Sequence, residues 1–245
     1  MKIVSLILAR GGSKGIPNKN IINVNGRPLI DYVIQSSNAS DCHETWVSTN
    51  CKEIKNISIQ SGAKVIDRPE EISRDDSKNE EAINHFFKNV DCDILVSIQP
   101  TSPLILPQDI NIGINLVKNL DCDSCFSATE KHWTPHWDHN IEPIEWYPEN
   151  RPFRQQKSIT YEENGAFYVT TKQNFNRTKL RYGGNLMPAI IPLSRSFQID
   201  SMEDLELVRI ILRGSDLYNS RNRHQSQRKT QHSEELDRYL KSGRV

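Results

Sequence analysis

The chain has 245 residues, of which 25% are charged, and its formal net charge is +0. This length allows one large α/β domain or two small ones, and the neutral balance gives no global field that favours nucleic acid or membrane partners. No apolar run approaches the roughly 18 residues of a membrane span. The apolar start of the chain runs directly into a charged loop, so we interpret it as a strand and not as a signal peptide.

The five cysteines are odd in number and scattered along the chain. This argues against a disulfide framework and favours a reducing, cytoplasmic setting. Cys122 and Cys125 form a Cys-x-x-Cys pair with His132 and His136 further on, which raises the question of zinc. The spacing fits no common zinc finger and the segment has the character of a strand, so we prefer ordinary packing.

The first stretch, KIVSLILA at residues 2–9, is a short apolar run rich in β-branched residues, typical of a buried parallel strand. Hydrophobic spacing then predicts an alternation of helices and strands. Helices are expected over 29–37, 53–61, 79–90 and 109–120, and strands over 44–49, 63–66, 93–98 and 124–128. The alternation predicts an α/β fold with right-handed parallel crossovers, in which ligands collect at the carboxyl ends of the strands.

Residues 131–157 break this pattern, because they are rich in Trp, His, Pro and Tyr and have weak periodicity. We expect an exposed excursion with short β-hairpin pieces, whose three tryptophans need burial on the domain or on a second subunit. Later elements are expected as a turn at 164–165 that leads into a strand, short strands over 189–193 and 197–200, a helix over 204–212, disorder over 219–232 and a short helix over 234–241.

The segment RGGSKGIPNKN, residues 10–20, follows the first strand. Its three glycines and one proline exclude a regular helix. A glycine-rich turn exposes backbone N–H groups, and the Arg and two Lys beside them suit a polyphosphate. The spacing matches neither the P-loop nor the dinucleotide motif, so the residues alone leave open a flexible basic turn without a ligand.

In this order, LARGGSKGIPNKN resembles the N-terminal signature of the acylneuraminate cytidylyltransferases, the family that makes CMP-sialic acid and related CMP-nonulosonates. The resemblance reaches about residue 213 through Arg68-Pro69, QPTSPL at 99–104, RQQ at 154–156, ENGAFYV at 163–169 and QIDSMEDL at 198–205. It implies a Rossmann-like nucleotidyltransferase fold over residues 1–213, with a mostly parallel central sheet. Residues 131–157 would be an inserted dimerisation and substrate excursion of a homodimer, and 214–245 a polar tail.

The resemblance implies that CTP is the nucleotide and that the basic loop holds its triphosphate. Arg10, Lys14 and Lys19 would offset charge as pyrophosphate leaves, and with Asp200 they are the expected catalytic residues. The expected nucleotide-binding residues are Arg10, Gly11, Ser13, Lys14, Lys19, Asn20, Arg68 and Asn79.

For the nonulosonic acid, the resemblance implies Gln99 near the anomeric hydroxyl and Arg154 as the bidentate partner of the carboxylate. Asn164 and Tyr168 would line the sugar pocket. Because Arg154 lies in the excursion, it is expected to act on the site of the partner subunit.

A cofactor, Mg²⁺ or Mn²⁺, is also implied. The family commonly has Asp-Ile-Asp, two carboxylates on one face of a strand that reach one metal ion bridging the phosphates. Here the pair is Gln198 and Asp200, so one ligand is a neutral amide oxygen. Ile105 is a second departure, where the family often has an Arg near the rim of the site.

The residues themselves leave bland alternatives open at several positions. The alternative for Lys19 is a solvated cation, and for Arg68 a surface ion pair with Glu70 or Glu71. The alternative for Gln99 is to satisfy backbone groups, and for Asn164 and Tyr168 to be a turn residue and a core residue.

The implied reaction transfers CMP from CTP to a nonulosonic acid and releases pyrophosphate. The alternatives are a cytidylyltransferase for another acid, such as Kdo or a phosphonate, and a catalytically impaired nucleotide-binding homologue, which Gln198 favours.

Overall fold

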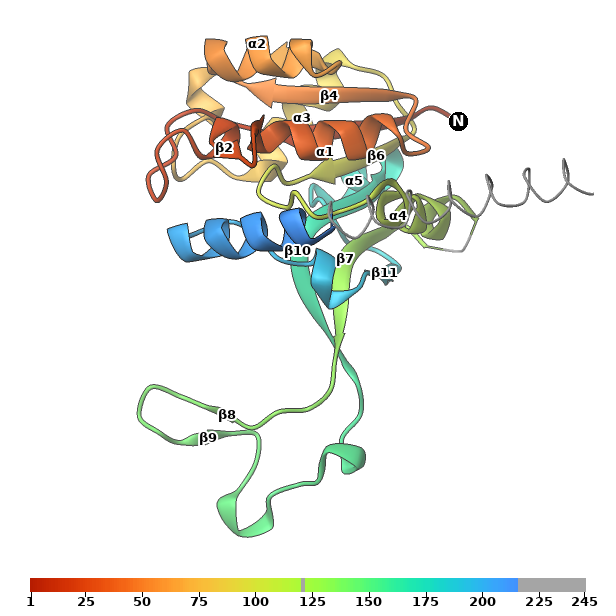
Figure 1. Cartoon of the computed structure of the whole chain (residues 1–245). Coiled ribbons are helices and arrows are strands. Elements are labelled where there is room, and N and C mark those ends of the chain that lie inside the picture. Colours follow the sequence, from red (N-terminus) through yellow and green to blue (C-terminus); the bar gives the residue numbers. More distant parts are fainter. Residues whose placement is uncertain (120–121, 216–245) are drawn as a thin grey trace, which may run out of the picture.

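A computed structural model of the chain describes residues 1–119 and 122–215. Its centre is a seven-stranded sheet with the order β11-β7-β10-β6-β1-β4-β5 (Figure 1). The strands are β1 (Ile3–Leu8), β4 (Glu44–Thr49), β5 (Lys64–Asp67), β6 (Ile94–Ile98), β7 (Ser124–Lys131), β10 (Thr160–Thr171) and β11 (Leu186–Ile190). Within this sheet only β10 runs antiparallel to its neighbours, so the predicted mostly parallel α/β fold is confirmed.

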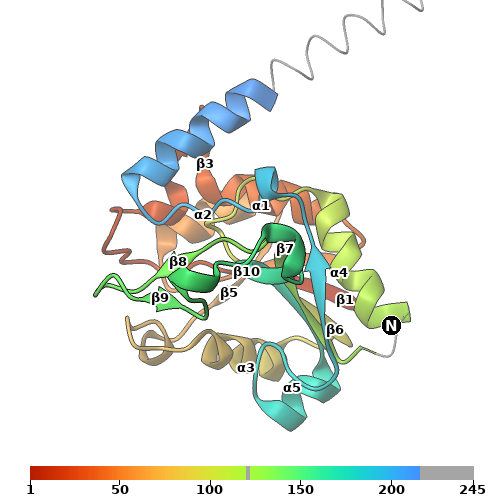
Figure 2. The same cartoon turned by 90° about the horizontal axis from the view of Figure 1, so that it is seen from below.

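Helices cover both faces of this sheet (Figure 2). They are α1 (Leu29–Asn38), α2 (Lys52–Gln60), α3 (Asn79–Asn89), α4 (Pro107–Asn119) and α5 (Lys172–Thr178), with a further helix over 202–215. The apolar face of α1 packs in one core cluster with α2 and α4, whereas α3 packs in a second cluster with Phe175 of α5. The sheet therefore lies between two layers of helices.

Strand β1 explains why the start of the chain is apolar without alternation. Ile3 and Ile7 point into the cluster that contains α1, and Val4, Leu6 and Leu8 point into the cluster that contains α3. A strand buried on both faces needs apolar side chains toward both of them, as in parallel sheets.

Two predictions of local structure are wrong, and one helix was not predicted. Asn164 and Gly165 form no turn but lie inside β10, where the pairing with β7 shifts register between Glu163 and Tyr168. Residues 197–200 were expected as a strand, which is wrong, since they pair with no strand of the described chain. Helix α5 was not predicted because its seven residues contain one buried apolar side chain, Phe175.

The segment between β7 and β10 projects well beyond the sheet as a long arm (Figure 1), and its role in dimerisation stays a prediction. It carries the short hairpin β8 (His136–Trp137) and β9 (Pro143–Ile144). Trp146 is buried against the rings of Trp133 and Trp137, with ring centroids 6.3 and 4.9 Å away. The tryptophans thus bury partly on one another, although 48% of Trp137 stays exposed.

The predictions for 219–232 and 234–241 lie outside the described residues, and the domain boundary near residue 213 stays a prediction. Within residues 1–119 and 122–215, no helix has the length and apolarity needed to cross a membrane.

Arg195 anchors the loop that follows β11 to α4. Its Nε and Nη2 donate to the carboxylate of Asp109 at 2.7 Å each, and that carboxylate is fully buried. Arg195→Met removes the cation from a buried anion, so we expect the free energy of unfolding to fall by about 3 kcal/mol. Urea denaturation monitored by circular dichroism measures this, and a change below about 1 kcal/mol would contradict it.

Candidate functional site

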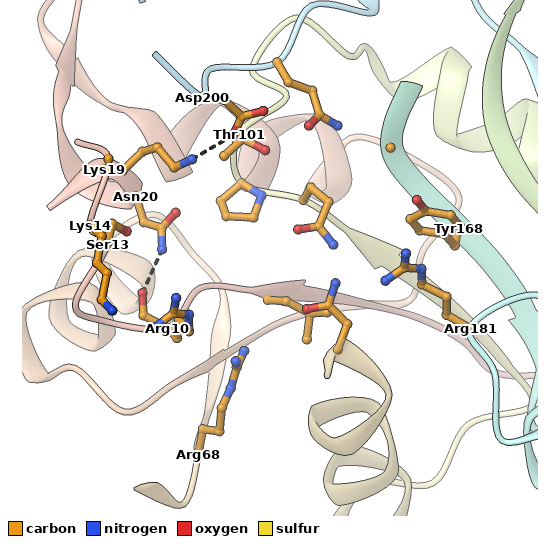
Figure 3. Close-up of a pocket in the computed structure, with 17 residues that line it drawn as sticks. Arg10, Ser13, Lys14, Lys19, Asn20, Arg68, Thr101, Tyr168, Arg181 and Asp200 are labelled. Atoms are coloured by element: carbon orange, nitrogen blue, oxygen red, sulfur yellow. Dashed lines mark hydrogen bonds and ion pairs between the residues drawn. The ribbon is translucent and has the colours of Figure 1, made fainter. Parts of the chain in front are cut away.

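A cavity of about 390 Å³ opens at the carboxyl ends of the parallel strands (Figure 3). Leu8 ends β1 and Arg68 follows β5, while Gln99 follows β6. This is where α/β sheets bind ligands. The lining residues are Leu8, Arg10, Ser13, Lys14, Gly15, Lys19, Asn20, Arg68, Asn79, Gln99, Pro100, Thr101, Gly165, Tyr168, Arg181, Gln198 and Asp200.

The shape of the basic loop is fixed by two left-handed residues and one buried amide. Gly12 has φ 72° and Asn18 has φ 53°, a region that Gly and Asn tolerate best. The side-chain amide of buried Asn20 donates to the Arg10 carbonyl at 2.9 Å. This bond ties the two ends of the loop together, so the cations between them face the cavity from one side (Figure 3).

Asp75 holds two of these cations, a contact that sequence reasoning missed. Arg10 Nη2 lies 2.8 Å from an Asp75 oxygen, and Lys14 forms an ion pair with the other oxygen. Hydrogen bonds from Lys14 and Arg10 hold the pKa of Asp75 below its usual value. Asp75 therefore pairs with donors that a polyphosphate would need.

Lys19 joins the loop to the C-terminal part of the site. Its Nζ lies 2.9 Å from Asp200 Oδ1, and 19% of its side chain is exposed. Lys19 is thus paired at the cavity and is not a freely solvated cation. Asp200 lies two residues before the helix over 202–215, whose start is capped reciprocally by Ser201 and Asp204.

Arg68 forms no ion pair with Glu70 or Glu71 among the described residues. Its guanidinium is buried and donates to Ser48 Oγ at 3.0 Å and to the Ser48 carbonyl at 2.9 Å. Burial, with a smaller effect of Arg10, lowers the pKa of Arg68 to about 10. A buried guanidinium that stays charged suits a site whose ligand is anionic.

Gln198 reaches the cavity because a glycine leaves room for it. Its Nε2 donates to the Asn164 carbonyl at 2.5 Å, and a Cβ on Gly165 would lie 2.7 Å from that nitrogen. Gly165 also has φ 68°, which favours glycine on its own. Gln198 and Asp200 thus face one cavity from an irregular segment that lies outside the sheet.

The described residues contain no cluster of three or more His, Cys, Asp and Glu that would hold a metal ion alone. The Asp200 carboxylate and the Gln198 side-chain amide offer two oxygen ligands for a metal ion at the cavity. Mg²⁺ typically binds through one or two protein oxygens together with water and substrate phosphates, so this donor set fits Mg²⁺.

Three predicted site residues lie outside the cavity. Gly11 lines an adjoining hollow, where its amide donates to Asn50 Oδ1 at 2.9 Å. Asn164 uses its side chain to brace the irregular part of β10, through Thr129 and Ala166. Arg154 is exposed and begins the short 3₁₀ turn Arg154–Gln156. This turn belongs to the arm, away from the sheet (Figure 1).

Other predicted residues do line the cavity. Asn79 opens α3, and Ser13 lies in the basic loop. Gln99 follows β6, and its backbone N–H donates to the Ala166 carbonyl. Tyr168 on β10 donates its hydroxyl to the Glu163 carboxylate, and burial together with this bond raises its pKa. Ile105 is buried in the core and is absent from the rim of the cavity.

Asp75→Asn is expected to lower the KM for a nucleoside triphosphate about two- to fivefold, because the phosphates no longer compete with a carboxylate for Arg10 and Lys14. Steady-state kinetics at constant ionic strength measures the change. Asp76→Asn is the matched control on the same loop, and a KM that rises in Asp75→Asn would show that the carboxylate instead orders the cations for binding.

The profile of the family described as Cytidylyltransferase matches residues 4–242. N-acylneuraminate cytidylyltransferase A of Danio rerio is 37% identical over 190 residues, which cover 74% of this chain and 44% of that protein. CMP-N,N'-diacetyllegionaminic acid synthase of Legionella pneumophila is 30% identical over 221 residues, 84% of this chain and 94% of that protein. The chain therefore spans less than half of the first relative and nearly all of the second.

Solved structures share the fold at low identity. CMP:2-keto-3-deoxy-manno-octonic acid synthetase, complexed with CTP, has a TM-score of 0.69 and 18% identity, over 88% of this chain and 100% of that chain. A 4-diphosphocytidyl-2C-methyl-D-erythritol synthase from Anaerococcus prevotii has a TM-score of 0.61 and 13% identity. The match covers 86% of this chain and 98% of that chain. Both comparisons support the predicted Rossmann-like fold.

Proposed function

Because the chain belongs to the cytidylyltransferase family, we propose that it transfers CMP from CTP to a nonulosonic acid and releases pyrophosphate. One observation carries the proposal: the cationic loop and Asp200 face the same cavity from chain segments 181 residues apart, linked by the Lys19 ion pair. The acceptor class follows the relatives, whose names specify N-acylneuraminate and diacetyllegionaminic acid.

The basic loop would hold the triphosphate of CTP, and Arg68 and Asn79 would lie against the cytidine part. The oxygen of the anomeric hydroxyl attacks the α-phosphorus, and its proton passes to water. A new P–O bond forms, and the bond from the α-phosphorus to the bridging oxygen breaks, so that pyrophosphate leaves. Arg10, Lys14 and Lys19 stabilise the negative charge that grows on pyrophosphate. Catalysis is then mainly positioning and charge stabilisation, as in other phosphoryl-type transfers.

We propose Mg²⁺ as the cofactor, held by Asp200 and Gln198 together with oxygens of the bound phosphates. Such an ion supplies charge neutralisation across the phosphates. Asp200 would then exchange its Lys19 partner for the metal, which leaves Lys19 free for a phosphate. Gln198 contributes a neutral oxygen, so this site binds the ion less tightly than a pair of carboxylates would.

The acceptor sugar would occupy the part of the cavity near Gln99 and Tyr168. In the proposed homodimer, Arg154 on the arm pairs with the sugar carboxylate in the site of the partner subunit. Tyr147 and Phe153 support a dimer, because they are 75% and 71% exposed on this arm and large exposed apolar side chains mark interfaces. A monomer at micromolar concentration in sedimentation equilibrium would contradict this assembly.

We also propose a cytoplasmic setting. Residues 1–119 and 122–215 hold all five cysteines and contain no disulfide, as is usual in a reducing compartment. Alkylation of protein taken directly from cells is expected to modify all five after unfolding, and a disulfide-protected pair would contradict the setting.

A coupled pyrophosphate assay tests the activity. The full chain with Mg²⁺ is given CTP or one of the other three nucleotides, together with N-acetylneuraminic acid, diacetyllegionaminic acid or Kdo. Pyrophosphate release with CTP and a nine-carbon acid is expected. Release with Kdo alone, or CTP binding without turnover on any acid, would contradict the proposal.

A further inference from the structure

Arg181 lies at the end of the cavity that is farthest from the basic loop, and its guanidinium points toward the cavity centre (Figure 3). It comes from the loop between α5 and β11, a part of the chain that no sequence motif singled out. Because Lys14 and Lys19 line the opposite end of the cavity, Arg181 is placed to contact the acceptor and not the triphosphate.

Aromatic rings hold this guanidinium in place. Its carbon Cζ lies 4.5 Å above the ring of Tyr168 and 5.8 Å from the ring of Tyr182. Those two rings are themselves stacked, with centroids 5.4 Å apart and planes at 16°. Since 25% of the Arg181 side chain is exposed, the guanidinium is a fixed feature of the cavity wall.

The guanidinium is also short of hydrogen-bond partners. Its Nε is buried without any partner among the residues that the structure describes. The nearest carboxylate oxygen, from Glu80, lies 3.9 Å from Nη1, which is too far for a hydrogen bond. Because Nε is closed to solvent, a ligand would meet the terminal nitrogens of the guanidinium. Arg offers five donors in a rigid fork, so a ligand oxygen beside those nitrogens would be favoured.

The surrounding charge favours a neutral oxygen over a phosphate or carboxylate. Glu80 forms the long ion pair with Arg181, and Glu163 binds the hydroxyl of the Tyr168 ring on which Arg181 stacks. These two carboxylates offset the positive charge and would repel a further anion. The strongly cationic end of the cavity is the other one, at the basic loop.

We propose that Arg181 is an acceptor-binding residue that determines specificity, by donating hydrogen bonds to a neutral oxygen on a ring substituent of the sugar acid. That oxygen belongs to an acylamino carbonyl or to a hydroxyl. The assignment rests on the proposed function, since it presumes that a sugar occupies this end of the cavity.

Arg181→Met removes the donors and keeps an unbranched apolar stem on Tyr168. We expect the KM for the acceptor to rise about tenfold, as for the loss of one hydrogen bond to a charged group, while the KM for CTP changes less than twofold. Arg177→Met is the matched control, because Arg177 comes from the neighbouring α5, is 60% exposed, and pairs with Asp123 outside the cavity. It is expected to leave both KM values near those of the wild type.

A pair of acceptors shows which oxygen Arg181 binds. The two acceptors differ at one carbon only, where one carries an acylamino group and the other a hydroxyl. A larger loss with the acylamino acceptor assigns the carbonyl, and an equal loss with both assigns a hydroxyl that they share. Arg181→Lys, which restores a donor, is expected to recover part of the affinity, and it replaces Arg181→Met if thermal melting shows the latter to be unfolded.

An unchanged acceptor KM in a folded Arg181→Met, or an equal rise in the KM for CTP, overturns the assignment while wild-type turnover stands. Absence of pyrophosphate release from the wild type with every acceptor overturns the proposed function, and the assignment with it.

Discussion

Lys19→Ala is expected to lower kcat/KM for pyrophosphate release about 10³-fold. Lys19 is the less exposed of the two lysines in the basic loop. Its ammonium points to the place where Asp200 and the phosphates would meet. Removing one charge-stabilising donor from a reacting centre typically costs 10²- to 10³-fold in rate. The ion pair is partly exposed, so we expect the melting temperature to change little.

Lys172→Ala is the matched control for this variant. Lys172 also forms one close ion pair, to Asp91 at 2.7 Å, but it lies outside the cavity. It is expected to retain wild-type kinetics. A folded Lys19→Ala with less than about a tenfold loss would show that Lys19 only anchors the Asp200 segment, since a structural contact at the surface carries little energy.

Asp200→Asn is expected to lower kcat about 10²- to 10³-fold and to raise the Mg²⁺ concentration for half-maximal rate about tenfold. The substitution keeps the size of the side chain and removes the only carboxylate that lines the cavity among the described residues. The remaining neutral oxygens are weaker ligands for a hard cation. Initial rates across a Mg²⁺ titration measure both effects.

Glu203→Gln is the control, because Glu203 is an exposed acid on the first turn of the following helix. It is expected to leave the Mg²⁺ titration unchanged. Near-wild-type pyrophosphate release by a folded Asp200→Asn would reject the metal role. A loss of rate without a shift in the Mg²⁺ titration would point instead to a role of Asp200 in orienting Lys19.

Sequence periodicity predicted the part of the fold in which burial is regular. Strands β1, β4 and β6 and helices α1 to α4 lie close to their expected ranges, because two-sided burial and amphipathic faces leave a direct pattern in the residues. The pattern failed at β10, where Gly165 allows a shift of register inside one strand. It also failed at 197–200. Ile199 is buried and Gln198 contacts the Asn164 carbonyl, so this irregular segment has the alternating pattern of a strand.

The site was predictable where one continuous motif carries it, as in the basic loop. Asp75 and Arg181 were missed, because their importance comes from contacts with Arg10 and Tyr168, far away in the chain. No local spacing encodes such contacts. The role of Arg154 stays a prediction, because its exposed place on the arm gives it no contact with the cavity of its own chain.

The most direct test of the central claim is ³¹P NMR of the full chain with CTP, Mg²⁺ and a nonulosonic acid. If the basic loop holds the β- and γ-phosphates while the α-phosphorus is attacked, the α-phosphorus signal becomes that of a phosphodiester and inorganic pyrophosphate appears in equal amount. Appearance of CDP with inorganic phosphate, or of a phosphorylated sugar, would place the attack at the γ-phosphorus and contradict the account.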